Sequence, residues 1–593
     1  MDKEENQMAD NTEIVRDVGK WEWSEMWKKE DWWAIWLGFF ILIAGMVIYF
    51  PHAGELKSKL QAVEAQYSRE ANRTDAFKTV AWYQLSDAKS KVKATSTPAG
   101  KWLKTFSAKT KGWAANPVEA FYLSQEKADA RKAKAMEKYD AAKAVSDQAL
   151  AAALAAEKIA EAEGFQSAAL NAKAKQAIQD WRNAHLKTGK AKSKMDAAKP
   201  YNRVGWLIFL GICFAVFFGV GMKIMGNSFK EFMIAFGFIF AISVLTHLAA
   251  SQATMKHYGI GYAAWAIFFG MLISNTVGTP KWVMPAVQTE FYIKTGLVLL
   301  GAKILFEKII TIGTAGIFVA WVVTPIVWLV TYWVGQKIIK IPSKRLNATI
   351  CSDMSVCGVS AAIATASACK AKKEELTLAV GLSLVFTSIM MILMPAVIHG
   401  FFPADKVEIL GGAWMGGTID ATGAVAAAGA FLGEKALNVA ATIKMIQNVL
   451  IGVMAFCVAV YFTTKVEAEE TGNKVGVMEI WYRFPKFVLG FMAASVIFSM
   501  IYSSFNSQIS GLGSTMIDQG AIKGMSDLFR GWFFTLSFVS IGLATNFREL
   551  KEHFSGGKPL ILYVFGQSFN LCLTLTMAYI VFYLIFPKLT ATI

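Results

Sequence analysis

Histidine and cysteine are scarce in this chain, with six of each in 593 residues. No Cys-x-x-Cys pair occurs, and so few histidines cannot complete a zinc set, so no metal site is predicted. The cysteines all fall in or beside apolar blocks, where small buried thiols are expected and the redox compartment is not revealed. They are Cys213, Cys351, Cys357, Cys369, Cys457 and Cys572.

Enzyme signatures are missing as well. The sequence has no Gly-x-Ser-x-Gly elbow, no His-Glu-x-x-His pair and no phosphate-binding Gly-x-x-x-x-Gly-Lys loop. These absences argue against an enzyme and against an ATP-driven pump. We expect no cofactor beyond a coupling Na⁺ or H⁺.

Long polar stretches are rare after Val204, where apolar blocks recur that are long enough to cross a bilayer. The chain as a whole is 54% hydrophobic. We therefore predict an all-α, polytopic membrane protein of about 13 spans. The predicted spans are 33–50, 204–225, 231–249, 258–278, 286–306, 312–337, 346–369, 375–400, 411–431, 437–463, 484–504, 524–546 and 558–587.

The residues before Val204 form three predicted regions. Residues 1–32 are polar and rich in tryptophan, which favours the headgroup level, and 33–50 is a permanent anchor. Residues 51–203 are rich in Ala and Lys and hold most of the net charge of +16. Strong helix formers over 126–183 predict two or three long antiparallel helices, with Gly164 marking a break. A stalk, a partner-docking platform and a lid all stay open for this insert, whose partner is unknown.

Lysine and arginine in the short loops predict the orientation. The loop with Lys337, Lys340, Lys344 and Arg345 is the most basic, so we place it in the cytoplasm of an inner-membrane protein. Alternation from there puts the N-terminus in the cytoplasm and the insert in the periplasm. The expected partners are the bilayer and a small-molecule or ionic substrate. No nucleic acid is expected, and a homodimer is left open.

Two runs of small residues interrupt the apolar spans, SDMSVCGVSAAIATAS at 352–367 and GGTIDATGAVAAAGA at 416–430. Lipid tails favour large apolar side chains, so we do not expect these segments to face lipid. Their small residues favour close helix packing, or a broken helix that lines a cavity. Broken helices near the midplane are typical of substrate sites in secondary transporters. The two runs therefore predict a transporter.

The first run offers Ser355, Cys357, Gly358 and Ser360 as substrate-binding residues. A break at Gly358 would direct the N-terminus of a half-helix, with its free N–H groups, at an anion. Asp353 is a candidate coupling group, or a helix cap at the cytoplasmic entrance. Packing within the helix is the rival interpretation for each hydroxyl.

The second run adds Thr418, Thr422 and Gly423 as binding residues and Asp420 as a coupling group. A carboxylate inside a membrane is functional by default, and Asp420 could bind Na⁺, relay a proton or neutralise a lysine.

Other polar residues of the spans have simpler interpretations. Lys444 is the candidate partner of Asp420, so a structural Asp420–Lys444 pair is the rival to a coupling role. Asn275 could line a pathway or cap a loop. Lys294 and Lys303 are expected to snorkel to the headgroups.

An internal echo also favours a transporter. Residues 295–309 and 536–550 align Gly301 with Gly542, Phe306 with Phe547 and Ile309 with Leu550. The predicted topology gives the two copies opposite orientations, as an inverted repeat requires.

Several motifs together point to a family. They are NTVGTP (275–280), KTGLVLLGAKI (294–304), VCGVSAAIA (356–364), KAKKEE (370–375), GGTI…AAAGA (416–430) and IKMIQNVLIG (443–452). This set, spread over about 258–587, resembles the YeiH-type sulfate exporter family. The resemblance implies a multi-span carrier with discontinuous helices and inverted repeats. The word sulfate is a family label and carries no evidence about this chain.

The chain departs from the family pattern in two places. The second run reads like GASIHE followed by Ala-Gln in the family, whereas Asp420, Ala421 and Ala424 stand at the matching positions here. Residues 1–203 are extra to the compact family form.

The predicted function is secondary transport of a small anion, such as a sulfur oxyanion, sulfonate or carboxylate, between the segments 346–369 and 411–431. One alternative is an Na⁺- or H⁺-coupled carrier of a non-anionic solute. Another is a degenerate carrier that serves as a sensor or assembly protein.

Overall fold

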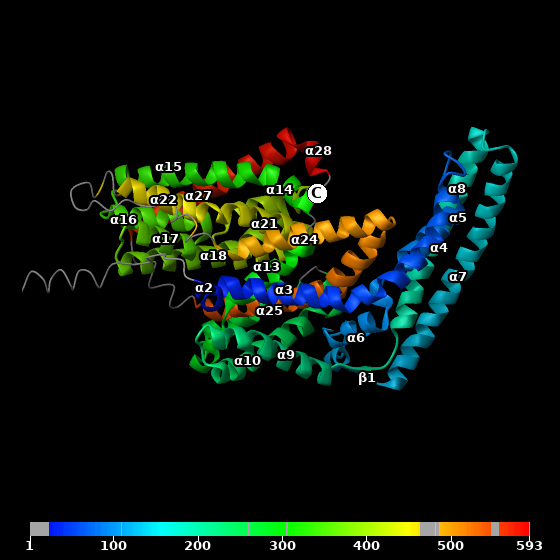
Figure 1. Ribbon diagram of the computed structural model, residues 1–593, viewed down its shortest axis with the longest axis horizontal. Coiled ribbons are helices and arrows are strands. Elements are labelled where there is room, and N and C mark those ends of the chain that lie inside the picture. The colour runs from blue at the N-terminus through cyan, green and yellow to red at the C-terminus, as the bar shows by residue number, and fades with distance from the viewer. Residues whose placement is uncertain are drawn as a thin grey trace, which may run out of the picture.

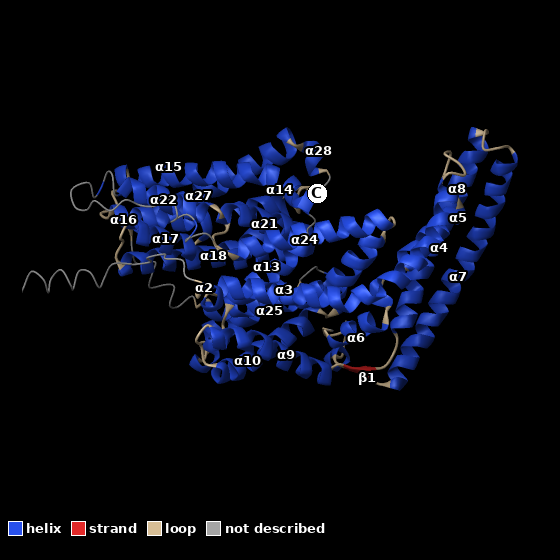
Figure 2. Ribbon diagram, in the orientation of Figure 1, coloured by secondary structure: helices blue, strands red, loops and turns tan. Residues whose placement is uncertain are grey.

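The computed structural model describes residues 23–107, 109–257, 261–303, 306–462, 466, 481, 485–546 and 557–591. Nearly all the elements in these ranges are helices (Figure 2), so the all-α prediction is confirmed. The exception is a single antiparallel pair of two-residue strands, β1 (Tyr122–Leu123) and β2 (Tyr201–Asn202).

Eight helices of the described part are long and apolar enough to cross a membrane. They occupy Glu30–Ala71, Val204–Ile224, Phe229–Ala250, Ile312–Lys337, Glu374–Phe401, Glu434–Tyr461, Phe487–Gln508 and Lys558–Ile585. Three shorter apolar helices are α12 (Tyr262–Thr276), α17 (Val359–Ala368) and α20 (Thr422–Leu432). The exact number of spans stays a prediction.

The insert forms an arm that extends from one end of the membrane helices (Figure 1). Its helices are α4 (Ala53–Ala71), α5 (Val80–Lys91), α6 (Pro98–Phe106), α7 (Gln125–Ala162) and α8 (Ala168–Ala197). The long helices α7 and α8 form a hairpin whose turn contains Gly164, as the composition predicted.

Ion pairs and a small core stabilise this arm. Trp181 of α8 is buried among apolar side chains from both helices of the hairpin. Arg182 donates to both carboxylate oxygens of Asp87 on α5, at 2.6 and 2.9 Å. This bidentate contact lowers the pKa of Asp87.

Indole N–H groups hold the insert against the membrane helices. Trp113 Nε1 donates to the carbonyl of Leu248 in α10 (Phe229–Ala250) at 2.8 Å. In return, Trp532 of α25 (Asp527–Ala544) donates to the carbonyl of Ser107 at 3.3 Å. The insert therefore docks on two membrane helices at one end of the protein.

Helix α13 (Thr289–Lys303) is the centre of the membrane core. It packs against α3 (Glu30–Tyr49), α24 (Phe487–Gln508) and α25, and its residues Leu297–Leu300 are fully buried. A Cβ on Gly301 would lie 2.2 Å from the carbonyl oxygen of Phe491, so only glycine permits this crossing of α13 and α24.

The second glycine of the internal echo has the same role. A Cβ on Gly542 would lie 2.6 Å from the carbonyl oxygen of Ile267 on α12. Helices α13 and α25 run antiparallel, because Lys303 at the end of α13 contacts Asp527 at the start of α25. Phe547 and Leu550 lie outside the described residues, so the inverted repeat stays a prediction.

Candidate functional site

The first small-residue run contains a broken helix. Helix α16 (Lys344–Ser352) continues as a wide turn, η6 (Asp353–Cys357), and the chain then reverses at Gly358 before α17 begins. Gly358 has φ 60° and ψ −128°, which is accessible in practice to glycine alone. An added Cβ would also lie 3.0 Å from Ser383 Oγ and 3.4 Å from the Cβ of Asp420. Gly358 therefore allows the break and the close approach of the second segment.

The second run breaks differently. Helix α19 (Ile409–Thr418) ends in an extended stretch, with ψ 129° at Ile419 and 136° at Ala421, and α20 begins at Thr422. No glycine is needed here, because this backbone conformation is open to any residue. The stretch leaves Asp420 between the two half-helices, 1% exposed.

Amide and ammonium side chains satisfy the carbonyls that the breaks release. Gln447 of α21 (Glu434–Asn448) donates to the carbonyls of Ser355 at 3.0 Å and Gly417 at 3.2 Å. Lys444, one turn earlier, donates to the carbonyl of Val356 at 2.6 Å. Helix α21 thus joins the two breaks, as buried backbone within a membrane requires.

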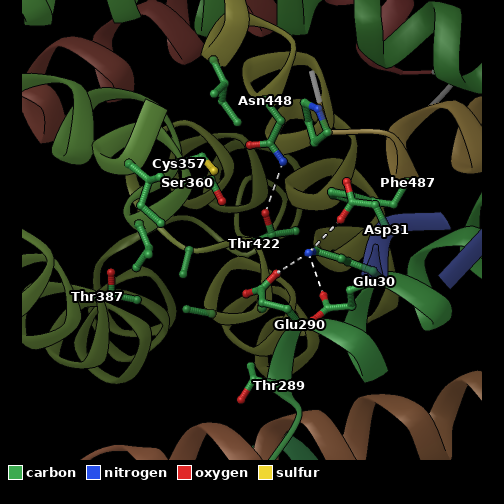
Figure 3. A pocket seen from close by; sticks show the side chains of 18 of the residues that line it. Glu30, Asp31, Thr289, Glu290, Cys357, Ser360, Thr387, Thr422, Asn448 and Phe487 are labelled. Carbon is green, nitrogen blue, oxygen red and sulfur yellow. Dashed lines mark hydrogen bonds and ion pairs between the residues drawn. The ribbon is translucent and has the colours of Figure 1, made fainter. Parts of the chain in front are cut away.

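Both half-helices begin at one cavity of about 670 Å³ (Figure 3). Cys357 and Ser360 line it from the first segment, and Thr422 and Gly423 line it from the second. No side chain caps the N-terminus of α17 or of α20. Two sets of free N–H groups and two positive helix ends therefore adjoin the same space.

Two buried carboxyl groups flank a tyrosine behind this cavity. Tyr563 of α27 (Lys558–Tyr579) donates to Asp420 Oδ2 at 2.6 Å, and its oxygen lies 3.3 Å from Asp353 Oδ2. Asp353 and Tyr563 have no exposed surface. The two candidate coupling groups are therefore brought together, through a residue that the sequence analysis did not single out.

Two interpretations of these charges need correction. Asp353 does not cap the start of a helix at the cytoplasmic entrance, because the Ser343 side chain caps α16 and Asp353 directly follows its other end, as the first residue of the wide turn. Asp420 and Lys444, both among the described residues, do not form an ion pair with each other. Lys444 donates instead to the Val356 carbonyl and to Gln447 Oε1 at 2.8 Å.

Three predicted binding residues make internal contacts. Ser355 donates to the carbonyl of Cys351, and Thr418 donates to that of Trp414, so both bond back into their own helices. Asn275 donates to the carbonyls of Met271 and Thr545 and joins the ends of α12 and α25. None of the three is among the residues that line the cavity.

The expectation that Lys294 and Lys303 snorkel to the headgroups is wrong. Lys294 lies 2.8 Å from Glu30 and 2.9 Å from Asp31, and Lys303 pairs with Asp527 at 3.0 Å. Each lysine is held by carboxylates of other helices. Snorkelling fails here because α13 is enclosed by protein and does not face lipid.

The cavity also has lining residues that sequence reasoning missed. Asn448 donates to Thr422 Oγ1 at 3.2 Å and orients that hydroxyl (Figure 3). Glu30, Asp31 and Glu290 surround Lys294 at the mouth. The density of carboxylates just before the first span was the available signal for this contact.

Comparison with known proteins gives the family. The sequence model of the family described as "Conserved hypothetical protein 698" matches residues 234–563. The chain belongs to this family.

Relatives named UPF0324 membrane protein occur in several bacteria. One from Nitratidesulfovibrio vulgaris is 57% identical over 588 residues, which cover 99% of this chain and 100% of the relative. UPF0324 membrane protein RB9488 of Rhodopirellula baltica is 54% identical over 412 residues, 68% of this chain and 74% of the relative. The inner membrane protein YeiH of Escherichia coli is 24% identical over 312 residues, 51% of this chain and 82% of the relative. No solved structure matches the chain.

The resemblance to YeiH-type proteins is thus confirmed, and a multi-pass membrane location follows from the family and the apolar helices. Both breaks, α21 and Tyr563 lie inside the range that the family model matches. The N-terminal carboxylates and the insert lie outside it. The long Nitratidesulfovibrio relative nevertheless aligns with almost the whole chain.

Proposed function

We propose that this UPF0324 protein is a secondary transporter of a small anion. The observation that carries the proposal is the meeting of two uncapped helix N-termini at one cavity. Free N–H groups and the positive end of a helix dipole favour negative charge, and two such ends converge here.

The surroundings of the cavity support an anion as substrate. Lys444 lies behind the first break, where its ammonium adds positive charge near the start of α17. Thr422 and Ser360 add hydroxyl donors, and Asn448 fixes the first of these. A volume of about 670 Å³ is in the range of small-molecule sites, so a hydrated oxyanion, a sulfonate or a carboxylate fits.

Uptake into liposomes tests the proposal. Purified protein is reconstituted and offered labelled sulfate, sulfite, isethionate and succinate, each under an imposed proton gradient, an imposed Na⁺ gradient or no gradient. We expect uptake of at least one anion above that of protein-free liposomes. If no anion moves under any condition, the proposal fails and the sensor or assembly function gains support.

A matched pair of variants ties the flux to this cavity. Thr422→Val removes a hydroxyl donor at the start of α20, and uptake should fall about tenfold for the loss of one hydrogen bond to a charged ligand. Thr576→Val makes the same chemical change at an exposed position of α27 and should transport like the wild type. Equal uptake by the two variants would place the substrate elsewhere.

A further inference from the structure

We infer that Asp353, Tyr563 and Asp420 form a proton-binding site, in which the two carboxyl groups share one proton and Asp420 takes up the proton that couples transport. The coupling role of Asp420 rests on the proposed function. The shared proton follows from the geometry alone.

The Tyr563 hydroxyl has a single proton to donate. That proton belongs to the 2.6 Å contact with Asp420, because the contact with Asp353 is 3.3 Å long. An ionised Asp353 would then place a negative oxygen against a lone pair of Tyr563. A protonated Asp353 instead donates its own O–H to that lone pair, which gives the chain Asp353–H···Tyr563–H···Asp420⁻.

The remaining oxygen of Asp353 supports this assignment. Asp353 Oδ1 is buried and has no hydrogen-bond partner among the described residues. A charged oxygen without a partner is costly in an apolar interior, whereas the carbonyl oxygen of a neutral carboxyl group costs much less. Asp353 therefore carries the shared proton at rest.

Charge balance assigns the second role to Asp420. With one shared proton, the Asp420 carboxylate and the Lys444 ammonium sum to zero inside the protein. A monoanion at the helix ends would leave an uncompensated negative charge. A proton taken from the aqueous phase by Asp420 restores neutrality, and the O–H bond formed there breaks when the anion leaves.

Few other groups face the pair. These are Lys444 on α21, Ser383 on α18 (Lys373–Phe401), and Tyr563 and Gln567 on α27. Lys444 is the single cation of this set. A second ionised carboxylate would therefore have no positive partner in the described surroundings.

Infrared spectroscopy of the purified protein tests the shared proton without any substrate. We expect a C=O band of a buried protonated carboxyl group at neutral pH that is absent in Asp353→Asn. The band should persist in Asp147→Asn, which changes an exposed carboxylate of the insert. A wild-type spectrum without this band, or a band that survives Asp353→Asn, overturns the assignment.

Liposome flux tests the coupling, with the labelled monoanion isethionate as the first probe and the other three anions after it. Under a proton gradient without Na⁺, the wild type should accumulate the anion. Asp420→Asn should lose this accumulation and keep anion exchange at equal pH. Asp147→Asn, which changes an exposed carboxylate of the insert, should accumulate like the wild type.

The outcomes separate this inference from the proposed function. Accumulation driven by Na⁺ alone refutes the coupling role of Asp420 while anion transport stands. Proton-driven accumulation by Asp420→Asn that matches the wild type refutes the role of Asp420. Absence of flux in every arm defeats the proposed function and with it the coupling role, and the infrared result then decides the shared proton alone.

Discussion

The two ends of α13 carry one lysine each, and the two lysines meet different surroundings. Lys294 lies at the end beside the N-terminal segment (residues 23–32), where Glu30 and Asp31 hold it at 2.8 and 2.9 Å. Lys303 lies at the end beside the insert, where it pairs with Glu434 and with Asp527 at 3.0 Å. The first end opens into the cavity, since Lys294 and its partners line it.

The end with the insert is joined by a denser set of contacts. Arg530 donates to Glu434 at 2.8 Å and to Asp527 at 2.9 Å, which links α13, α21 and α25. Lys109 of the insert lies close to Arg530. A cavity at one end and a charge network at the other is the asymmetry expected of one state of an alternating-access carrier. Both ends are completed by residues outside the range that the family model matches.

Labelling of Cys357 tests this asymmetry most directly. Cys357 lines the cavity, whereas Cys351 and Cys369 are fully buried. In a variant that keeps only Cys357, a membrane-impermeant maleimide should react from the side of the N-terminal segment and not from the side of the insert. Right-side-out and inverted vesicles provide the two sides, and Cys357→Ser in the same background gives the blank. Equal labelling from both sides would contradict a one-sided cavity.

Removal of one carboxylate should weaken the network at the insert end. Asp527→Asn leaves Lys303 and Arg530 with Glu434 as their shared carboxylate. Removal of one member of a partly buried ion pair lowers the free energy of unfolding by about 3 kcal/mol. Thermal unfolding in detergent should show a lower midpoint than for the wild type. Asp147→Asn breaks an exposed pair with Lys143 and should leave the midpoint unchanged. A midpoint as high as that of the wild type would show that this network does not stabilise the closed end.

The sequence revealed most of the fold because bilayer physics is simple. Apolar blocks predicted the helices, and runs of small residues predicted the broken segments. Local composition could not show that α13 is enclosed by protein. The sequence analysis therefore expected Lys294 and Lys303 to snorkel to the lipid headgroups.

Partners far apart in the sequence were the other limit. Cys357, Ser360, Thr422 and Gly423 line the cavity, and their role in binding a substrate stays a prediction. Tyr563 is an ordinary tyrosine in an apolar span until its distance to Asp420 is known. Asp420 and Lys444 were paired as opposite charges inside consecutive predicted spans, and packing gave each a different partner.

A pH dependence at the insert end is the third expectation. Burial and, to a smaller extent, repulsion from Arg530 lower the pKa of Lys109 to about 8, against an opposing attraction from Asp527. The unfolded chain binds this proton more tightly, so stability should rise as pH increases from about 8 to 10.5.

The free energy of unfolding should rise by about 2 kcal/mol. This is less than the full shift in pKa would give, because the Lys109 side chain is only half-buried. Chemical unfolding across this pH range should show it, and Lys109→Met should flatten it. Lys134→Met, at an exposed position of α7, should keep the slope of the wild type. A slope that persists in Lys109→Met would assign the effect to another group.

The smallest effect is expected at the open end. Glu30→Gln with Asp31→Asn removes two of the three carboxylates around Lys294 and leaves Glu290, at 3.9 Å. These groups are partly exposed, so the loss of stability should stay near 1 kcal/mol. The N-terminal segment should leave the mouth more often, and the rate of Cys357 labelling should rise about threefold, as a change of that size in the opening equilibrium allows. Glu55→Gln, which breaks the exposed pair with Lys59, provides the control. If the double variant labels at the rate of the wild type, the N-terminal carboxylates do not restrict the mouth, and the two ends of α13 differ in structure alone.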